Sequence, residues 1–285
     1  KMKMDLGVDV LPKFSKDTTD RNRTSPFAFT GNKFEFRMPG SAENLSDCNT
    51  ILNTAVAKEL KQFVAETEDA ADFECAAAAW VKKTLNAHRR VIFNGNGYSE
   101  AWEQEAERRG LPNRKCTPDA MVALKDEKNI ALMEEFGVLT KTEMLSRYEV
   151  EMEHYSKVIN IEARTMLKIA NKQLIPAATS YMGEVAGSAA AKMSAVEGIS
   201  THAEQQLLVE LTKHTDEMSD AAVALKEITD RVCAMEDETA KAHAFHDEVL
   251  PAMARLRAAA DLAEEIVDEE YWPLPCYSRI LFYTE

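Results

Sequence analysis

The chain lacks the long apolar segments that would place it in or across a membrane. No stretch approaches the roughly 18 apolar residues that a membrane-spanning helix needs. The N-terminal stretch, KMKMDLGVDVLPKF, also lacks the apolar run of a signal peptide. We therefore expect a soluble protein with no membrane partner and a cytoplasmic location.

Cysteine is scarce, and its spacing excludes the common cysteine-based sites. The five cysteines include no C-x-x-C pair, so the sequence does not indicate a zinc site. Their odd number and wide scatter favour reduced thiols over a disulfide framework. They are Cys48, Cys75, Cys116, Cys233 and Cys276.

Positive charge is in deficit, because 34 lysines and arginines face 48 acidic residues and the formal net charge is −14. This balance argues against a nucleic-acid partner. Apolar residues make up 45% of the 285 residues, which is typical of a globular chain with one large or two ordinary domains.

The segment Asn22–Arg37, reading NRTSPFAFTGNKFEFR, holds the most informative pattern in the chain. It ends in the alternating run KFEFR, which predicts a strand. On a strand, Lys33, Glu35 and Arg37 would share one face, and the two phenylalanines would pack on a core from the other.

The charged face of this strand has two interpretations. A carboxylate between two cations can ligate Mg²⁺ or Mn²⁺ while the guanidinium binds phosphate oxygens. An amphipathic strand with a solvated charged face has the same pattern. The alternation alone does not decide between them.

The order of short motifs resembles glutamine synthetases. The loop NRTSP (22–26), the strand KFEFR and the turn PGS (39–41) are similar to the end of their catalytic domain. In that family an N-R-S/T loop carries a phosphate-binding arginine, and an R-x-E-x-R strand carries a metal-ligand glutamate and a substrate arginine. The form FAFTGNKFEFR is similar to the long, third class of these enzymes.

The resemblance implies roles for four residues. Glu35 would ligate a divalent metal, Mg²⁺ or Mn²⁺, and Arg37 would neutralise charge on the transferred phosphoryl group in catalysis. Arg23 would hold the phosphates of ATP, with Lys33 as a further phosphate ligand. The sequence departs from the shorter classes at Ala28, where they have a second arginine.

Later stretches carry the same resemblance. Leu111–Leu139 is similar to a segment shared across glutamine synthetases, and YWPLPCY (271–277) is similar to the ending of the long class. The turn FNGNGYS (93–99) also resembles that class, and it predicts a tight turn before a helix capped by Ser99. We interpret this turn as structural, because it is neither G-x-G-x-x-G nor a P-loop.

The family also needs further metal-ligating carboxylates and a histidine on earlier strands, and none of these precedes Asn22 here. We therefore expect the chain to be the C-terminal portion of a longer enzyme and to be inactive alone.

The expected fold class is α+β. Residues 1–139 would be the C-terminal part of the catalytic domain, with a few strands and packed helices. One such helix is expected at residues 49–64, packed under the catalytic sheet through the stripe Ile51, Leu52, Ala55, Val56 and Leu60. Residues 140–285 would be a helical C-terminal domain with long coiled-coil-like helices.

A seam of apolar residues in the heptad positions a and d runs through the helix expected from Thr201. Such a seam must be buried against another helix, within the chain or between subunits. His214 and His246 fall on seam positions, where a packed or register-setting histidine and a metal ligand are both conceivable. Pro251 is expected to kink or break the last helix, and the tail RILFY (279–283) is expected to form a strand.

The function implied by the resemblance is ATP-dependent amidation of glutamate by ammonia through γ-glutamyl phosphate. The implied partners are these substrates, with ATP and Mg²⁺ or Mn²⁺ as cofactors, and further copies of the chain in stacked rings. The alternative is a non-catalytic helical oligomerisation or interaction module in which the motif strand binds no metal.

Overall fold

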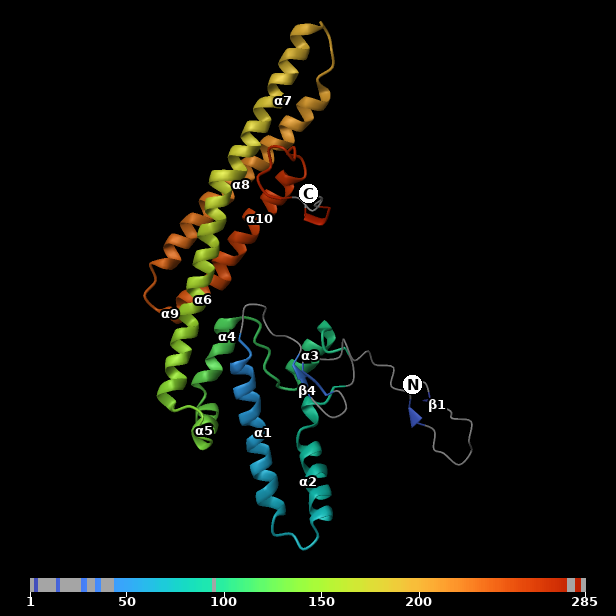
Figure 1. Cartoon of the computed structure of the whole chain (residues 1–285), viewed down its shortest axis with the longest axis vertical. Coiled ribbons are helices and arrows are strands. Elements are labelled where there is room, and N and C mark those ends of the chain that lie inside the picture. The colour runs from blue at the N-terminus through green and yellow to red at the C-terminus, as the bar shows by residue number, and fades with distance from the viewer. Residues whose placement is uncertain are drawn as a thin grey trace. The chain divides into compact units, whose positions relative to one another are not determined.

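The structure, a computed structural model, describes residues 44–93, 96–275 and 280–282, together with the backbone of four short strands. The strands pair as two antiparallel hairpins with two or three residues per strand. Helices form almost all of the rest (Figure 1). The strands are β1 (Lys3–Met4), β2 (Phe14–Ser15), β3 (Phe27–Phe29) and β4 (Phe34–Phe36).

The expected α+β class is wrong. Over the described residues no sheet has more than two strands, and the architecture is all-α. A two-stranded hairpin is marginal by itself and needs further strands or a packed helix for stability. The alternating run KFEFR predicts a strand of a catalytic sheet, and the described residues contain only the two hairpins.

The helices follow in chain order, with η2 and η3 as 3₁₀-helices and η4 and η5 as π-helical segments. Up to residue 135 they are α1 (Ser46–Thr67), α2 (Phe73–Ala87), η2 (Arg89–Val91), α3 (Glu100–Arg108), α4 (Thr117–Met121), η3 (Val122–Lys125) and α5 (Glu127–Glu135). After it they are α6 (Lys141–Ile169), η4 (Ala170–Leu174), α7 (Ile175–Ala195), α8 (His202–Cys233), α9 (Glu238–Ala244), η5 (Phe245–Val249) and α10 (Leu250–Glu264).

The chain divides into two compact units. The first comprises Lys1–Lys115 and Glu127–Lys141, and the second comprises Cys116–Asp126 and Thr142–Glu285. The assignment of residues 1–139 to the end of a catalytic domain and of 140–285 to a separate domain stays a prediction.

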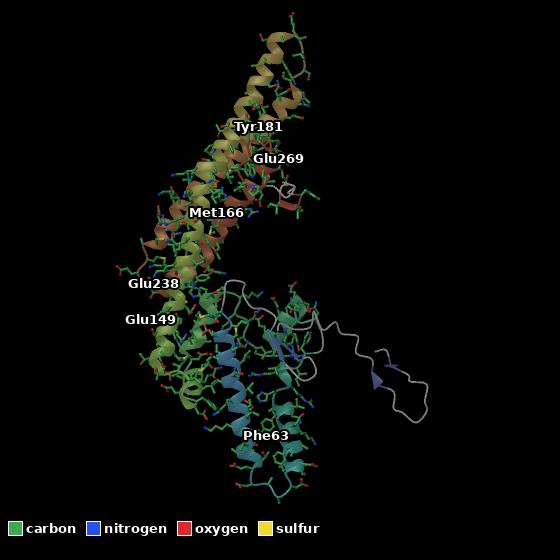
Figure 2. All side chains as sticks on the ribbon, viewed as in Figure 1. Phe63, Glu149, Met166, Tyr181, Glu238 and Glu269 are labelled. Atoms are coloured by element: carbon green, nitrogen blue, oxygen red, sulfur yellow. The ribbon has the colours of Figure 1, made fainter. Side chains whose placement is uncertain are left out.

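In the first unit α1 and α2 lie side by side as a helical hairpin (Figure 1). The ring of Phe63, labelled in Figure 2, meets that of Trp80 edge to face at 5.1 Å between centroids. Asp72 caps α2 by accepting a hydrogen bond from the backbone N–H of Cys75 at 3.0 Å. The hairpin is therefore held by ring contacts and a capped turn.

Ion pairs connect helix α5 to helix α1. The Glu135 carboxylate accepts from Nζ of Lys58 at 2.6 Å and from Nζ of Lys61 at 2.9 Å. The two lysines hold the pKa of Glu135 below its usual value. Solvent reaches all three groups, so these bonds orient α5 and add little stability.

The helix expected at 49–64 is present as α1, but its apolar stripe is not buried within the described residues. Leu60 is 58% exposed, and Ile51 and Val56 are about as open. The spacing predicted the helix correctly, while the packing of this face under a sheet stays a prediction.

The second unit has a continuous apolar core in which α8 is central. Leu211, Met218, Leu225 and Val232, one face of α8, are each fully buried. They pack with α7, α10 and the π-helical segments (Figure 1). The predicted seam is thus real, and it is buried within the chain rather than between subunits.

Pro176 and Pro251 each follow a π-helical turn instead of breaking the helix. Segment η4 precedes Pro176 and η5 precedes Pro251, and each proline lies in the first turn of the next α-helix. A proline ring clashes with the carbonyl one turn earlier and removes an N–H donor. A wider π turn can accommodate this, so the break expected at Pro251 appears as a local change of helix type.

The tail is only partly docked. Trp272 is 6% exposed and packs on the core, and the Tyr271 ring lies 5.4 Å from that of Tyr181. Farther on, Ile280 and Leu281 have helical backbone and exposed side chains, so the strand expected for this run is wrong over these residues. A search of the described helices finds none with the length and hydropathy needed to cross a bilayer.

Candidate functional site

The strand predicted to carry the site is present in the backbone. Residues Phe34–Phe36 form β4, and Glu35 lies opposite Ala28 of β3 in the antiparallel register. The residue that replaces the second arginine of the shorter classes is therefore the cross-strand partner of the predicted metal ligand.

The side chains of this predicted site lie outside the part of the chain that the structure describes. This holds for Arg23, Lys33 and Arg37 entirely, and for Glu35 beyond its backbone. Their predicted roles in phosphate and metal binding remain predictions.

The described residues contain no group of three or more histidine, cysteine, aspartate or glutamate side chains placed to hold a metal ion. His214 is 8% exposed in the α8 seam, with Nδ1 3.1 Å from Oε2 of Glu217 on the same helix. His246 is more open and lies 2.7 Å from Oδ1 of Asp247. His214 thus packs in the core against its own helix, in line with the packed-histidine interpretation.

The best-defined polar site comprises the described residues of the predicted FNGNGYS turn and the helix after it; Asn94 and Gly95 lie outside the described residues, so the tight turn expected there stays a prediction. Ser99 caps α3, because its Oγ accepts from the backbone N–H of Trp102 at 3.4 Å and donates to the carbonyl of Asn96 at 2.8 Å. The helix start and its cap were both predicted. Trp102 also stacks on Phe93 at 4.1 Å between ring centroids, which ties the helix to the start of the turn.

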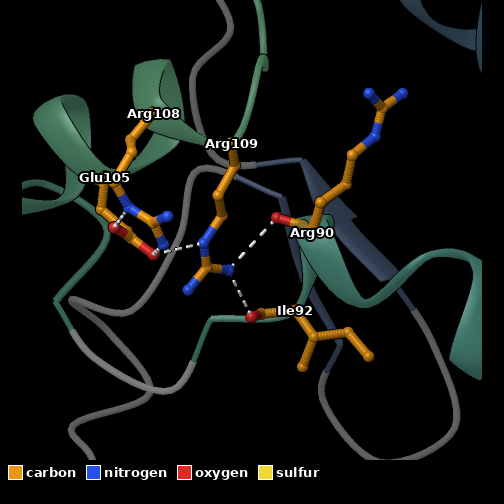
Figure 3. A network of polar contacts seen from close by, with 5 residues as sticks. All are labelled: Arg90, Ile92, Glu105, Arg108 and Arg109. Atoms are coloured by element: carbon orange, nitrogen blue, oxygen red, sulfur yellow. Dashed lines mark hydrogen bonds and ion pairs between the residues drawn. The ribbon is translucent and has the colours of Figure 1, made fainter.

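Arg109, at the C-terminal end of α3, hydrogen-bonds to the backbone of the segment that precedes the turn (Figure 3). Its Nη1 donates to the carbonyl oxygen of Arg90 at 3.2 Å and to that of Ile92 at 2.9 Å. Its Nε donates to Oε1 of Glu105 at 2.6 Å. One guanidinium therefore joins the segment before the turn to the helix after it.

Glu105 is fixed by two arginines. Arg108 donates two hydrogen bonds to its carboxylate, each at 2.7 Å, in addition to the bond from Arg109 (Figure 3). Arg108 first and Arg109 second lower the pKa of Glu105 from its ordinary 4.5 to about 2. The carboxylate is charged throughout the neutral range and so holds both guanidinium groups in place.

This geometry disfavours phosphate binding at the turn. A helix N-terminus attracts anions through its unpaired N–H groups and its dipole. At α3 the Ser99 side chain already occupies that end, and Glu100 and Glu103 place two negative charges in the first turn. The side chains of Ser99 and Arg109 instead bind backbone groups on either side of the turn, which agrees with its structural interpretation.

Sequence reasoning missed the Arg109 contacts. A signal for one of them existed, because Glu105 and Arg109 are four residues apart and such pairs meet on a helix. No pattern indicates that the same guanidinium also reaches two backbone carbonyls some seventeen to nineteen residues earlier.

Comparison with known proteins gives the family. Residues 76–193 match the family described as Glutamine synthetase C-terminal domain. The chain is 36% identical over 289 aligned residues to "Type-3 glutamine synthetase" of Dictyostelium discoideum, covering 98% of this chain and 39% of that protein. It is 37% identical over 283 residues to "Glutamine synthetase" of Butyrivibrio fibrisolvens, covering 94% of this chain and 39% of that protein.

A third relative, "Glutamine synthetase" of Bacteroides fragilis (strain YCH46), is 34% identical over 303 residues, covering 99% of this chain and 40% of that protein. Together with the matched C-terminal domain, these likenesses show that the chain belongs to the glutamine synthetase family. Within the family it is similar to the C-terminal portion of the long, third class. The chain spans about two fifths of the length of these relatives.

Proposed function

We propose that this chain serves as the C-terminal portion of a glutamate–ammonia ligase that uses ATP to amidate glutamate through γ-glutamyl phosphate. The observation that carries the proposal is the likeness to a type-3 glutamine synthetase over 98% of the chain, which includes the motif segment Asn22–Arg37. The helical units described above would then support or extend a catalytic domain completed elsewhere.

In this proposal the motif residues act by charge and position. Arg23 and Lys33 would bind the phosphates of ATP, and Arg37 would face the phosphoryl group as it moves to glutamate. A phosphoryl group in transfer spreads negative charge over its outer oxygens, and fixed cations stabilise that charge. A guanidinium is suited to this role because its planar fork binds two oxygens at once.

A divalent metal, Mg²⁺ or Mn²⁺, is implied by the family, and Glu35 would be one of its ligands. The described residues offer no cluster of three ligating side chains, so they do not make up a metal centre by themselves. Hard cations such as Mg²⁺ and Mn²⁺ require several oxygen ligands. The other ligands would belong to further parts of the enzyme, and no step through the metal is derived from this chain.

The alternative, a free-standing helical interaction module, depended on the heptad seam being open to a partner. That seam is buried in the core of the second unit, so its apolar residues are not open to a partner protein. Assembly into stacked rings and a cytoplasmic location belong to the ligase proposal.

The proposal is tested on the native protein from its source. We expect a polypeptide much heavier than the 31.9 kDa of this chain, with γ-glutamyl-transfer activity that Glu35→Ala abolishes. Removing a ligating carboxylate should cost orders of magnitude in rate, because charge stabilisation supplies most of the catalysis in this chemistry.

The matched control is Glu59→Ala, which removes an exposed carboxylate from α1 and should leave the activity unchanged. A native protein of this chain's own mass that binds neither Mn²⁺ nor nucleotide would sink the proposal. Equal activity of Glu35→Ala and Glu59→Ala enzymes would remove Glu35 from it.

A further inference from the structure

The hairpin of α1 and α2 carries two apolar stripes that stay open within the described residues. Each stripe repeats every fourth residue, and side chains at that spacing lie on one face of a helix. The five large members of the stripes are between 48% and 58% exposed. The stripes consist of Val56, Leu60 and Val64 on α1 and of Ala77, Val81 and Leu85 on α2.

Contacts across the hairpin indicate that both stripes lie on the same side of it. The rings of Phe63 and Trp80 meet edge to face between the two helices. To one side of these rings, Nζ of Lys83 lies 2.7 Å from Oε2 of Glu66. Successive residues of an α-helix are turned by about 100°. In two antiparallel helices this rotation places both stripes on the side opposite the ion pair, where they form one surface, the hairpin face.

No described element covers the hairpin face. Helix α5 contacts α1 through Lys58 and Lys61, which lie on a different side of that helix. Helix α2 has no buried residue along its whole length. A contiguous exposed apolar patch on a soluble protein is typical of a surface that binds another part of a protein.

The length of the relatives indicates what covers this face. The chain spans about two fifths of them, and it matches a domain described as C-terminal. More than half of such an enzyme therefore lies outside the chain. Helix α1 begins shortly after the motif segment Asn22–Arg37, so the hairpin is the first helical element to follow the predicted catalytic residues.

We propose that the hairpin face docks the part of the longer enzyme that precedes this chain. Helix α2 would then be covered together with α1, and the two helices would form one apolar interface between the C-terminal portion and the rest of the polypeptide. The inference rests on the proposed function in requiring a longer enzyme, but it does not depend on that enzyme's activity.

Thiol labelling on the two sides of α2 tests the proposal. Leu85→Cys places a thiol on the hairpin face, and Ala79→Cys, at an exposed position on the opposite side of α2, is the matched control. Both substitutions are made in this chain and in the native-length enzyme. Labelling by a maleimide is followed by peptide mass spectrometry, which distinguishes the introduced thiol from the five native cysteines.

In this chain we expect the thiols at positions 79 and 85 to react at similar rates. In the native-length enzyme the thiol at position 85 should react about tenfold more slowly, because a covered group reacts only when its contact opens. The thiol at position 79 should keep its rate. Equal rates at position 85 in the two proteins would overturn the proposal, and so would equal protection of both positions.

A second copy of the chain is the other occupant that the labelling detects. Slow labelling of Leu85→Cys in this chain that depends on protein concentration would show self-association through the hairpin face, and would overturn the proposal.

Leu85→Asp provides a second measurement on the same two proteins. It should lower the thermal unfolding temperature of the native-length enzyme and leave that of this chain unchanged, because the side chain is exposed here. Equal effects in the two proteins would contradict the docking. An active long enzyme with an unprotected position 85 would remove the docking proposal alone. An inactive long enzyme in which position 85 is protected would remove the ligase proposal alone.

Discussion

At the scale of single residues, the acidity of Glu105 is the sharpest electrostatic feature of the described chain. Arg108 and Arg109 lower its pKa to about 2, below the 4.5 of the free side chain. The folded state therefore binds fewer protons than the unfolded state between these values. The contribution of Glu105 to stability is complete above pH 4.5 and is lost as the pH falls toward about 2.

We predict that the carboxyl carbon of Glu105 titrates with a midpoint near pH 2 in a solution NMR experiment. Arg108→Ala should raise this midpoint the most, because its two hydrogen bonds are the largest cause of the shift. Arg109→Ala should raise it less. A wild-type midpoint near 4.5 would show that the arginines do not hold the carboxylate as described.

At the scale of elements, α7 shows two glycines inside a long helix without an evident need for them. The helix continues through Gly183 and Gly187, and a Cβ atom at either position would meet no atom within 4 Å. Neither glycine allows a close approach.

We therefore predict that Gly183→Ala and Gly187→Ala each stabilise the chain, by about 0.5–1 kcal/mol. Alanine restricts the unfolded backbone and fits the helix without strain. Gly198→Ala is the contrasting control, because its φ of +76° in the turn between α7 and α8 disfavours any side chain. Urea denaturation measures all three, and a loss of stability at Gly183 or Gly187 would show that glycine is required there.

The elements also show what the sequence can and cannot predict. The 3-4 spacing of apolar residues located α1 and α8, because a repeat of that period suits one face of a helix. The spacing gave no sign of the π turns η4 and η5, since the change from α to π geometry depends on how each proline packs.

The candidate site was predicted less completely than the helices. The strand at Glu35 and the cap at Ser99 followed from alternation and from turn chemistry, which are local properties. The reach of Arg109 to the Arg90 carbonyl depends on the path of the intervening chain. The fold class failed for a similar reason, because a strand pattern does not state how many strands will pair with it.

At the scale of the whole molecule, the two units differ in how they bury apolar surface. The second unit holds a large contiguous core that includes Leu225, Met218 and Phe245, each almost fully buried. In the first unit α2 has no buried residue, and the only buried residues of α1 are Thr54 and Thr67. The apolar stripe of α1 with Ile51, Val56 and Leu60 is therefore exposed within the described residues.

This difference predicts that the same change of side chain lowers the stability by very different amounts in the two units. Leu225→Ala should lower the free energy of unfolding by about 2–5 kcal/mol, because it leaves a cavity in the core. Leu60→Ala in this chain should change it by no more than about 0.5 kcal/mol, since that side chain is 58% exposed. Guanidinium denaturation followed by circular dichroism measures both.

In a full-length enzyme of the same class the Leu60→Ala substitution should lower the stability considerably more, because a catalytic sheet packed on α1 would bury that face. Equal small losses in the short and long proteins would show that α1 keeps its apolar stripe in solvent, and the predicted packing of this helix under a sheet would then fail.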